Sequence, residues 1–256
     1  GGIILGKDNN WYFLTHHGTG DWSGRIVSLL PVTWVQDWPI PGEVLPQNIG
    51  TMKWDGKIPF KHTEKLSIKR SDDFDEDCLA PQWQWNYQPR KDYFSLTERP
   101  GWLRLKAYRP LETNNLLKAG NTLTQRTFRK QNNDVTIKMD ISNMQDGQKN
   151  GLCHFSSQHS AIGIVKEEDA CYLEYRKNGN ITKGIQIHSE FVWFRTEWGM
   201  DGKSQYYYSL DGDNFLPFGE KYQLTWGNYR GDRIGIYCFN DKKEDGFVDI
   251  DYCHYR

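Results

Sequence analysis

Short runs of β-branched and aromatic residues, separated by Gly, Asn and Asp turns, follow one another along most of the chain. Such runs are typical of β-strands, and helical periodicity is almost absent. From about Leu66 onward the turns are spaced as in a two-sheet antiparallel sandwich. The strands expected there include residues 102–108, 121–128, 135–141, 151–156, 161–166, 171–177, 191–196, 204–209, 222–226, 233–240 and 246–255. The sequence therefore predicts an all-β fold.

The N-terminal part of the chain reads as a separate region. Residues 1–42 contain three strand-like runs, at 3–5, 11–16 and 25–34. A Pro- and Gly-rich stretch, from Pro39 to about residue 65, follows these runs. Proline removes a backbone donor and fixes φ, so this stretch is a poor candidate for continuous regular structure. We expect a first region at 1–42, a linker at 43–65 and a β-sandwich at 66–256.

Composition limits the partners of the chain. The 32 basic and 33 acidic residues nearly cancel and form no basic stripe, so nucleic acid is not an expected partner. No apolar run approaches the roughly 20 residues that span a bilayer, so no membrane is expected either. Aromatic residues make up 14% of the chain, with 11 Trp. Their flat faces and polar edges suit both sugar rings and a large β-sheet core, and composition leaves both open.

The five cysteines have no C-x-x-C spacing, which gives little support to a zinc or redox site. An odd number leaves at least one of them unpaired or intermolecular. Cys78 and Cys253 could meet if the first and last sandwich strands pair. The start of the chain, Gly1-Gly2-Ile3-Ile4-Leu5-Gly6, has no basic segment of a signal peptide and reads as the interior of a longer sequence.

Two long segments carry a family resemblance. Residues 79–126, with Trp83-Gln84-Trp85-Asn86-Tyr87-Gln88-Pro89 and the run from Phe94 to Leu105, resemble the concanavalin A-like domain that ends family 43 glycoside hydrolases of the β-xylosidase type. The segment from Trp11 to Arg25, continuing to Pro39, resembles the last blade of the same family's five-bladed β-propeller. The resemblance implies a concanavalin A-like jelly-roll sandwich preceded by a partial propeller blade.

The resemblance also implies roles for individual residues of the blade segment. A family histidine near a calcium on the propeller axis corresponds to His17, with His16 as the competing assignment, and the arginine that reaches the sugar pocket corresponds to Arg25. A guanidinium fork suits two sugar hydroxyls, and calcium prefers oxygen ligands that one histidine could only supplement. The structural alternatives are a buried, hydrogen-bonded His16 and an Arg25 that forms a salt bridge.

No catalytic residue is expected within the chain. Inverting hydrolysis needs two positioned carboxyl groups, and the resemblance places the acid, the base and a third aspartate on earlier blades. The acidic runs at 72–77 and 241–245 match none of the family's catalytic motifs and read as solvated turns. We therefore expect the chain alone to be inactive.

Within the sandwich, Trp193, Trp198 and Phe215 are the aromatic residues expected to be exposed and to contact sugar. In the family, a sandwich loop reaches over and helps close the pocket. Trp83, Trp85 and Tyr87 alternate with the amide residues Gln84, Asn86 and Gln88. This pattern fits an aromatic platform for a sugar chain and equally a surface that packs the sandwich onto the propeller. Asp249 and Asp251 alternate in the last strand. We expect them either to bind a structural calcium, with Asp249 as a ligand, or to protect a sheet edge from aggregation.

These observations predict the C-terminal portion of a β-xylosidase or α-L-arabinofuranosidase acting on xylan or arabinoxylan oligosaccharides. The expected partners are xylo- or arabino-oligosaccharides and the propeller catalytic portion. The alternative is a free-standing xylan-binding module without hydrolase activity. A periplasmic or secreted location is expected over a cytoplasmic one.

Overall fold

The computed structural model describes residues 1–57, 67–227 and 230–256. The chain divides into two compact units, Gly1–Gly20 with Gly24–Ile68 and Asp21–Ser23 with Lys69–Arg256. The described helical segments are single 3-10 turns at Pro46–Asn48 (η1), Lys91–Tyr93 (η2) and Leu116–Lys118 (η3). None of the helices in this part of the chain is long and apolar enough to cross a bilayer. The predicted all-β fold is confirmed.

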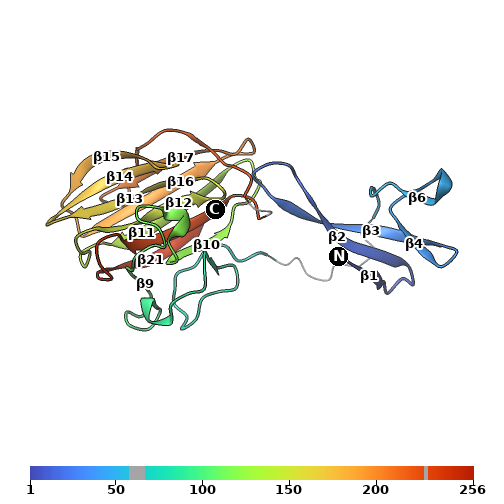
Figure 1. Ribbon diagram of the computed structural model, residues 1–256, viewed down its shortest axis with the longest axis horizontal. Helices are drawn as coiled ribbons and strands as arrows, with labels where there is room; N and C mark the ends of the chain where they lie inside the picture. The colour runs from blue at the N-terminus through green and yellow to red at the C-terminus, as the bar shows by residue number, and fades with distance from the viewer. Residues whose placement is uncertain (58–66, 228–229) are drawn as a thin grey trace. The chain divides into compact units, whose positions relative to one another are not determined.

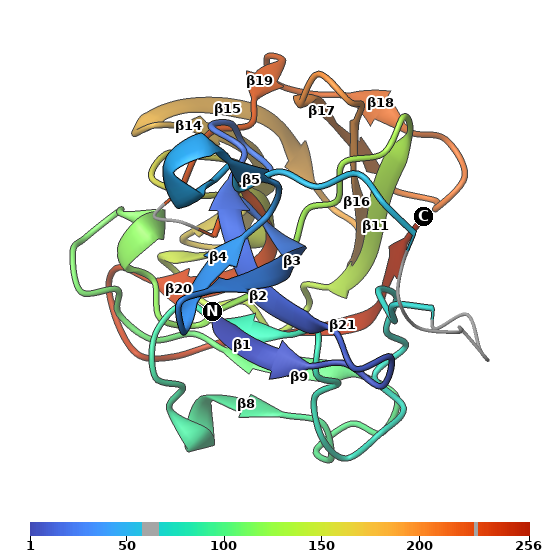
Figure 2. The same cartoon turned by 90° about the vertical axis from the view of Figure 1, so that its right-hand side faces the viewer.

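The first unit holds a four-stranded antiparallel sheet in the order β1-β2-β3-β4 (Figure 2). Its strands are Gly2–Leu5 (β1), Trp11–Gly18 (β2), Arg25–Val35 (β3) and Trp38–Pro41 (β4). Gln36 and Asp37 both have positive φ angles, which matches the two-residue hairpin turn between β3 and β4. The prolines of β4 were expected to start an irregular stretch, and this expectation was wrong. Proline is tolerated there because β4 is an edge strand.

The stretch after this sheet is only partly regular. Val44–Leu45 (β5) pairs with Ile49–Gly50 (β6) around η1, forming a small hairpin inside the expected linker. The expected linker ends at residue 65, and its last eight residues, 58–65, lie outside the described residues.

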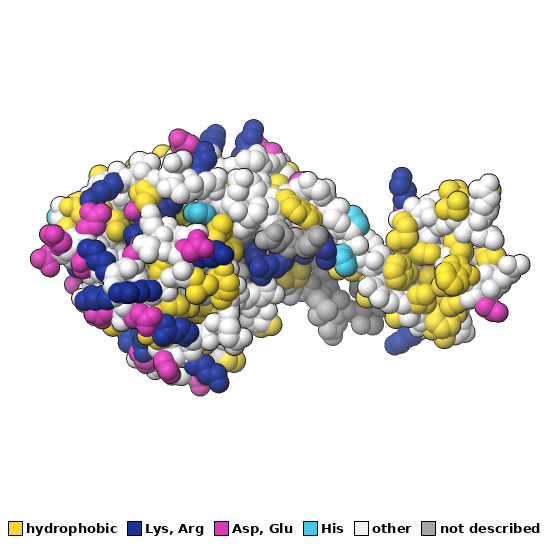
Figure 3. All heavy atoms as spheres, in the orientation of Figure 1, with side chains coloured by type: hydrophobic (Ala, Val, Ile, Leu, Met, Phe, Trp, Pro, Cys, Tyr) yellow, Lys and Arg dark blue, Asp and Glu magenta, His cyan; other side chains and the backbone are white. Residues whose placement is uncertain are grey.

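The four-stranded sheet is apolar on both faces. Directly opposed residues share a face, so Phe13 and Leu30 lie on one face, and Leu14 and Leu29 lie on the other. Many apolar side chains stay exposed, with Val27 at 69% and Trp38 at 71%; Ile3, Ile4, Leu5, Trp11, Leu14, Ile26 and Trp34 are the others on these strands. Figure 3 shows hydrophobic side chains gathered on the surface of this unit. Such a sheet is typical of a middle layer with cover on both sides.

The second unit is a sandwich of two antiparallel sheets (Figure 1). The seven-stranded sheet has the order β15-β14-β13-β12-β20-β10-β7. Its strands are Gln84–Trp85 (β7), Thr122–Arg126 (β10), Gln148–Phe155 (β12), His159–Glu167 (β13), Ala170–Lys177 (β14), Asn180–Ile187 (β15) and Arg233–Asn240 (β20). Asn178 and Gly179 both have positive φ between β14 and β15, as a two-residue hairpin turn requires.

The eight-stranded sheet has the order β18-β17-β16-β11-β21-β9-β8, with β19 paired to β17. Its strands are Phe94–Ser95 (β8), Leu103–Lys106 (β9), Asn133–Asp140 (β11), Phe191–Trp198 (β16), Lys203–Ser209 (β17), Leu216–Pro217 (β18), Tyr222–Gln223 (β19) and Phe247–Tyr255 (β21). The pairing of strands distant in sequence, such as β21 with β9 and β11, is consistent with a jelly-roll topology.

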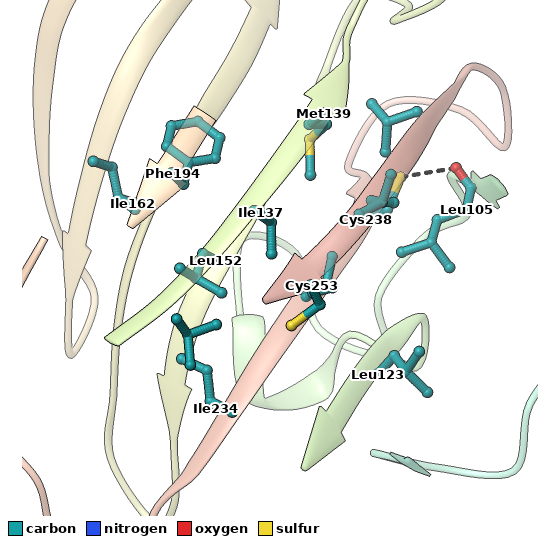
Figure 4. Close-up of a cluster of buried hydrophobic side chains, with 14 of the residues drawn as sticks. Leu105, Leu123, Ile137, Met139, Leu152, Ile162, Phe194, Ile234, Cys238 and Cys253 are labelled. Carbon is teal, nitrogen blue, oxygen red and sulfur yellow. Dashed lines mark hydrogen bonds between the residues drawn. The ribbon is translucent and has the colours of Figure 1, made fainter. Parts of the chain in front are cut away.

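The main core lies between the two sheets. Figure 4 shows Ile137 and Met139 of one sheet beside Leu152 and Ile162 of the other, and all four are at most 1% exposed. Burial of each such side chain contributes roughly 1.5–3 kcal/mol. Trp22 and Trp83 also belong to this core, and the indole nitrogen of Trp83 donates to Asp72. Trp83 and the half-buried Trp85 therefore pack inside the second unit and do not form an open platform.

The last strand departs from simple alternation. A register shift in the pairing of β21 with β11, between Lys138 and Met139, leaves Asp251 without a directly opposed partner, as in a β-bulge. Val248 and Ile250 therefore point into the core before the bulge and Cys253 after it, whereas Asp249 lies on the outer face. The suggested bond between Cys78 and Cys253 was also wrong: Cys253 is buried, Cys78 is exposed, and both are free thiols.

Candidate functional site

The outer face of the eight-stranded sheet carries a group of aromatic side chains. On β16, Phe191, Trp193 and Arg195 point outward, whereas Val192 and Phe194 are fully buried. Trp193 stands opposite Lys138 of β11, which in turn stands opposite Tyr252 of β21. The indole nitrogen of Trp193 donates to the Tyr252 hydroxyl at 3.1 Å. We call Trp102, Phe191, Trp193 and Tyr252 the aromatic face.

Lys138 lies among the rings of the aromatic face. Its Nζ is 5.2 Å from the ring centres of Trp102 and Phe191 and 5.8 Å from that of Trp193. The same nitrogen is 2.7 Å from Asp251 Oδ2. Cation–π contacts of this kind hold side chains in fixed positions and contribute about 0.5–1 kcal/mol each at exposed sites. The aromatic face is therefore ordered before any ligand arrives.

A network of charges borders the aromatic face. Asp249 accepts from Arg104 through both carboxylate oxygens, at 2.8 Å each, and from Arg99 at 3.1 Å. Arg99 also donates to Asp140 at 2.7 Å and lies 3.7 Å over the ring of Trp102. Burial alone would raise the pKa of Asp140, but the hydrogen bonds from Ser142 and Arg99 hold that pKa below its usual value. The hydrogen bond to Asp249 raises the pKa of Arg104, so the Arg104 guanidinium and the Asp140 carboxylate both stay charged at neutral pH.

This network does not fit calcium at Asp249. The carboxylate is 1% exposed and its oxygens are occupied by two guanidinium groups, whereas calcium needs six to eight oxygen ligands. The described residues contain no group of three His, Cys, Asp or Glu side chains placed to hold a metal ion. The two guanidinium groups compete with any cation for this carboxylate, and a calcium at Asp249 stays a prediction.

Phe215 lies on the same sheet face as Trp193. The Arg195 guanidinium stacks on the Phe215 ring at 3.7 Å, and its Nε donates to Thr136 at 3.0 Å. The loop that carries Phe215 is held by Asp211, whose Oδ1 accepts from the backbone nitrogens of residues 213 and 214. Hydrogen bonds from the Asn214 side chain and from these backbone groups lower the pKa of Asp211. The structure thus brings two of the three predicted aromatic residues onto one side.

Trp198 lies on the opposite side of the sheet. It is 3% exposed, its indole nitrogen donates to the Phe128 carbonyl at 3.2 Å, and its ring packs edge-on against Tyr255. The prediction that Trp198 is an exposed element was wrong. Trp193 and Trp198 are five residues apart on one strand, so strand alternation places their side chains on opposite faces.

The first unit holds Arg25 and His17. Arg25 opposes Gly18 and His17 opposes Ile26, so the register places the two side chains on opposite faces of the sheet. His17 is exposed, with Nδ1 2.8 Å from Ser28 Oγ. His16 is exposed as well, so its interpretation as a buried histidine was wrong. One imidazole beside a hydroxyl could supplement a calcium but would need oxygen ligands from elsewhere.

Sequence reasoning missed most of the aromatic face. Trp102 and Tyr252 were not singled out, because the segment before β9 and the strand β21 come close to β16 only in the folded sheet. Phe191 was missed although it shares β16 with Trp193. One pattern in the sequence could have indicated part of it. Phe191, Trp193 and Arg195 occupy alternate positions of one expected strand, so their side chains point to the same face.

The fold and the site define a class: a jelly-roll β-sandwich with an aromatic, charge-bordered outer face. Residues 71–256 match the model of the β-xylosidase C-terminal concanavalin A-like domain. The chain belongs to this family, whose domain is described as the C-terminal one of β-xylosidases.

Relatives match the chain along its length. A β-xylosidase of Formosa agariphila is 33% identical across the whole chain, which covers 47% of that protein. A protein of Xylanibacter ruminicola is 30% identical over 92% of the chain and 43% of its own length. The structure of a bifunctional GH43-CE protein of Bacteroides eggerthii matches the whole chain and 34% of its own, with a TM-score of 0.80 and 27% identity. The chain spans less than half the length of these relatives.

Proposed function

We propose that this chain completes a β-xylosidase or α-L-arabinofuranosidase that acts on xylan or arabinoxylan oligosaccharides. In this proposal the acid and base carboxylates come from a propeller catalytic portion outside the chain, and the chain alone does not hydrolyse glycosides. The sandwich packs on that portion and helps to close the sugar pocket.

The observation that carries the proposal is the sheet of β1 to β4, which is apolar on both faces. A propeller blade is covered on both sides by its neighbours, so an isolated blade leaves apolar side chains in water. The relatives extend well beyond the matched region, which gives room for the covering blades. The four-stranded sheet is accordingly proposed to be the last blade of the propeller.

Individual residues receive roles within this proposal. Arg25 reaches the sugar pocket from the blade, where its guanidinium fork binds sugar hydroxyls or a carboxylate. His17, with His16 as the competing assignment, lies near a calcium on the propeller axis, to which the propeller portion would supply most of the oxygen ligands. The loop of residues 210–215, with Phe215, is the sandwich element proposed to reach the pocket, because Asp211 fixes its shape.

The exposed side chains of the blade provide the structural test. The chain is joined to the propeller portion of its own reading frame, and the exchange of backbone amides is followed by mass spectrometry. Peptides of β2 and β3 should become protected in the joined protein, and Val27→Asp should abolish that protection. Leu111→Asp, at a leucine of the second unit that is 74% exposed, is the matched control and should leave it intact. Unchanged exchange on joining would refute the proposal.

The second candidate function is a binding module for xylan-like chains. It is favoured by the aromatic face, where Trp102, Phe191 and Trp193 offer ring surfaces beside hydrogen-bonding groups. This candidate requires no hydrolysis and is compatible with a chain that is inactive alone.

A further inference from the structure

A pocket of about 490 Å³ opens on the seven-stranded sheet, away from the aromatic face. It is formed by the loop before η3, the turn between β12 and β13 and the hairpin between β14 and β15. Next to it, Leu116 and Ala119 cover Phe155 and Phe239 in a second small core, separate from the core between the sheets. Its lining residues are Asn114, Asn115, Leu117, Ser157, Gln158, His159, Asn178 and Gly179. We call it the amide pocket.

Among the residues that the structure describes, no carboxylate, lysine or arginine belongs to the lining of the amide pocket. Three asparagines, a glutamine, a serine and a histidine supply both hydrogen-bond donors and acceptors, and Leu117 is the one aliphatic side chain in the lining. Such a lining offers no charge to an anion, too few acidic oxygens to a cation and little apolar surface to a hydrophobic ligand. It matches a neutral molecule that carries several hydroxyl groups.

The polar groups of the pocket are held in fixed positions. Asn114 Oδ1 accepts from Arg176 Nη1 at 2.7 Å and from Lys149 Nζ at 3.1 Å. Asn178 Nδ2 donates to Gln158 Oε1 at 3.1 Å, and Asn178 Oδ1 accepts from the backbone nitrogen of His159 at 3.0 Å. Within the described part of the chain, no hydrogen bond is found for Asn114 Nδ2 or Gln158 Nε2. Two amide donors are therefore available to a ligand.

His159 is the most deeply buried of the polar lining residues. It is 7% exposed, and its Nδ1 has no hydrogen-bond partner within the described residues. An unsatisfied buried polar group costs about 1–3 kcal/mol. Burial, together with the positive charge of Arg176, lowers the pKa of His159 to about 4, so the imidazole is neutral at neutral pH. A neutral imidazole can accept a hydrogen bond from a hydroxyl through one nitrogen and donate one through the other.

We propose that the amide pocket is a binding site for one unit of a neutral saccharide, with His159, Gln158 and Asn114 as its hydrogen-bonding residues. The neutral ring of His159 in the lining, the available amide donors and the absence of charged side chains from the described lining together carry the assignment. This site shares no residue with the aromatic face or with the sheet of β1 to β4, so the experiment below tests it independently of the function proposed above.

The test is a titration of the full 256-residue chain with xylotetraose, and with maltotetraose as a second neutral saccharide, followed by the ring signals of labelled histidines in NMR. We expect the His159 ring nitrogens to shift with either sugar and the signals of the exposed His188 to stay in place. His159→Phe should weaken binding at least fivefold, and His188→Phe should not change it.

Gln158→Ala, at an exposed position, keeps the test decisive if His159→Phe fails to fold. It should weaken binding about threefold or more while leaving the unfolding midpoint unchanged. The proposal is overturned if neither sugar moves the His159 signals at millimolar concentration. It is equally overturned if binding survives Gln158→Ala but is lost in Trp193→Ala, which would place the sugar on the aromatic face.

Discussion

Arg104 and Asp249 form two parallel hydrogen bonds, Nε to Oδ1 and Nη2 to Oδ2, both at 2.8 Å. This bidentate pair joins β9 to the last strand, β21, where Arg104 and Asp249 stand directly opposite each other. Arg99 adds a second cation to the same carboxylate. The last strand is therefore fixed by an ion-pair network at the place where the sequence suggested a metal ligand.

Asp249→Asn should lower the free energy of unfolding by about 2 kcal/mol, because it leaves two arginines without their shared anion. Their partial exposure lets water compensate some of the loss. Urea unfolding measures the change. Asp251→Asn is the matched control and should cost about 0.5 kcal/mol, since Asp251 and Lys138 are both partly exposed. Equal losses in the two variants would contradict this account.

A chelator should leave the unfolding midpoint of the chain unchanged. Asp249 is occupied by arginines, and no metal-binding group of three is found among the described residues. Thermal unfolding with and without EDTA measures this directly. A fall of several degrees on chelation, restored by added calcium, would show that the chain holds a structural metal.

Trp83→Phe should destabilise the second unit by about 1–3 kcal/mol. The indole nitrogen donates to Asp72 Oδ2 at 2.7 Å in a buried setting, and phenylalanine leaves that carboxylate oxygen without this donor. Trp85→Phe is the control, since the half-buried Trp85 packs against Phe94. It should cost less, through lost packing alone. Equal destabilisation would mean that the hydrogen bond to Asp72 contributes nothing measurable.

Stability should fall as the pH is lowered from about 6.5 to 4, in part through His159. The pKa of His159 is about 4 in the folded chain and near 6.5 when unfolded, so the unfolded chain takes up a proton first. The full effect is roughly 3 kcal/mol, and it is absent above the unfolded pKa. Urea unfolding of the wild type and His159→Phe across this range should show a shallower pH dependence in the variant. Identical slopes would show that His159 titrates normally.

Trp193→Ala tests the aromatic face. If this surface binds xylan-like chains, the variant should lose binding to xylohexaose by tenfold or more, since stacking on an aromatic ring supplies much of the contact. Tyr87→Ala, at an exposed tyrosine of the second unit, is the control and should bind as the wild type does. Full retention of binding in Trp193→Ala would count against the binding-module function.

The sandwich could largely be predicted from the sequence, because long strands with β-branched and aromatic residues carry a local signal. Turns can carry a local signal as well. The turn at Asn178-Gly179 has two positive φ angles, which these residue types adopt readily. The strand β15 was not predicted, because it is an edge strand with mostly exposed side chains and shows no inward stripe.

The site could be predicted only in part. Trp193 and Phe215 were found, but Trp198 was misplaced because strand parity was not applied to it. The position of Asp249 depends on arginines 145 and 150 residues away in sequence, and no local pattern shows such a contact. The β-bulge opposite Lys138 and Met139 likewise depends on pairing between distant strands, so the inward face of the last strand could not be derived from alternation alone.

The most direct test of the central claim is the hydrolysis of aryl β-xylosides and aryl α-L-arabinofuranosides by the chain alone and by the chain joined to the propeller portion of its own reading frame. The account predicts no turnover by the chain alone, turnover by the joined protein, and a strong loss of that turnover in Arg25→Ala. Turnover by the chain alone that a point mutation within it abolishes would contradict the account.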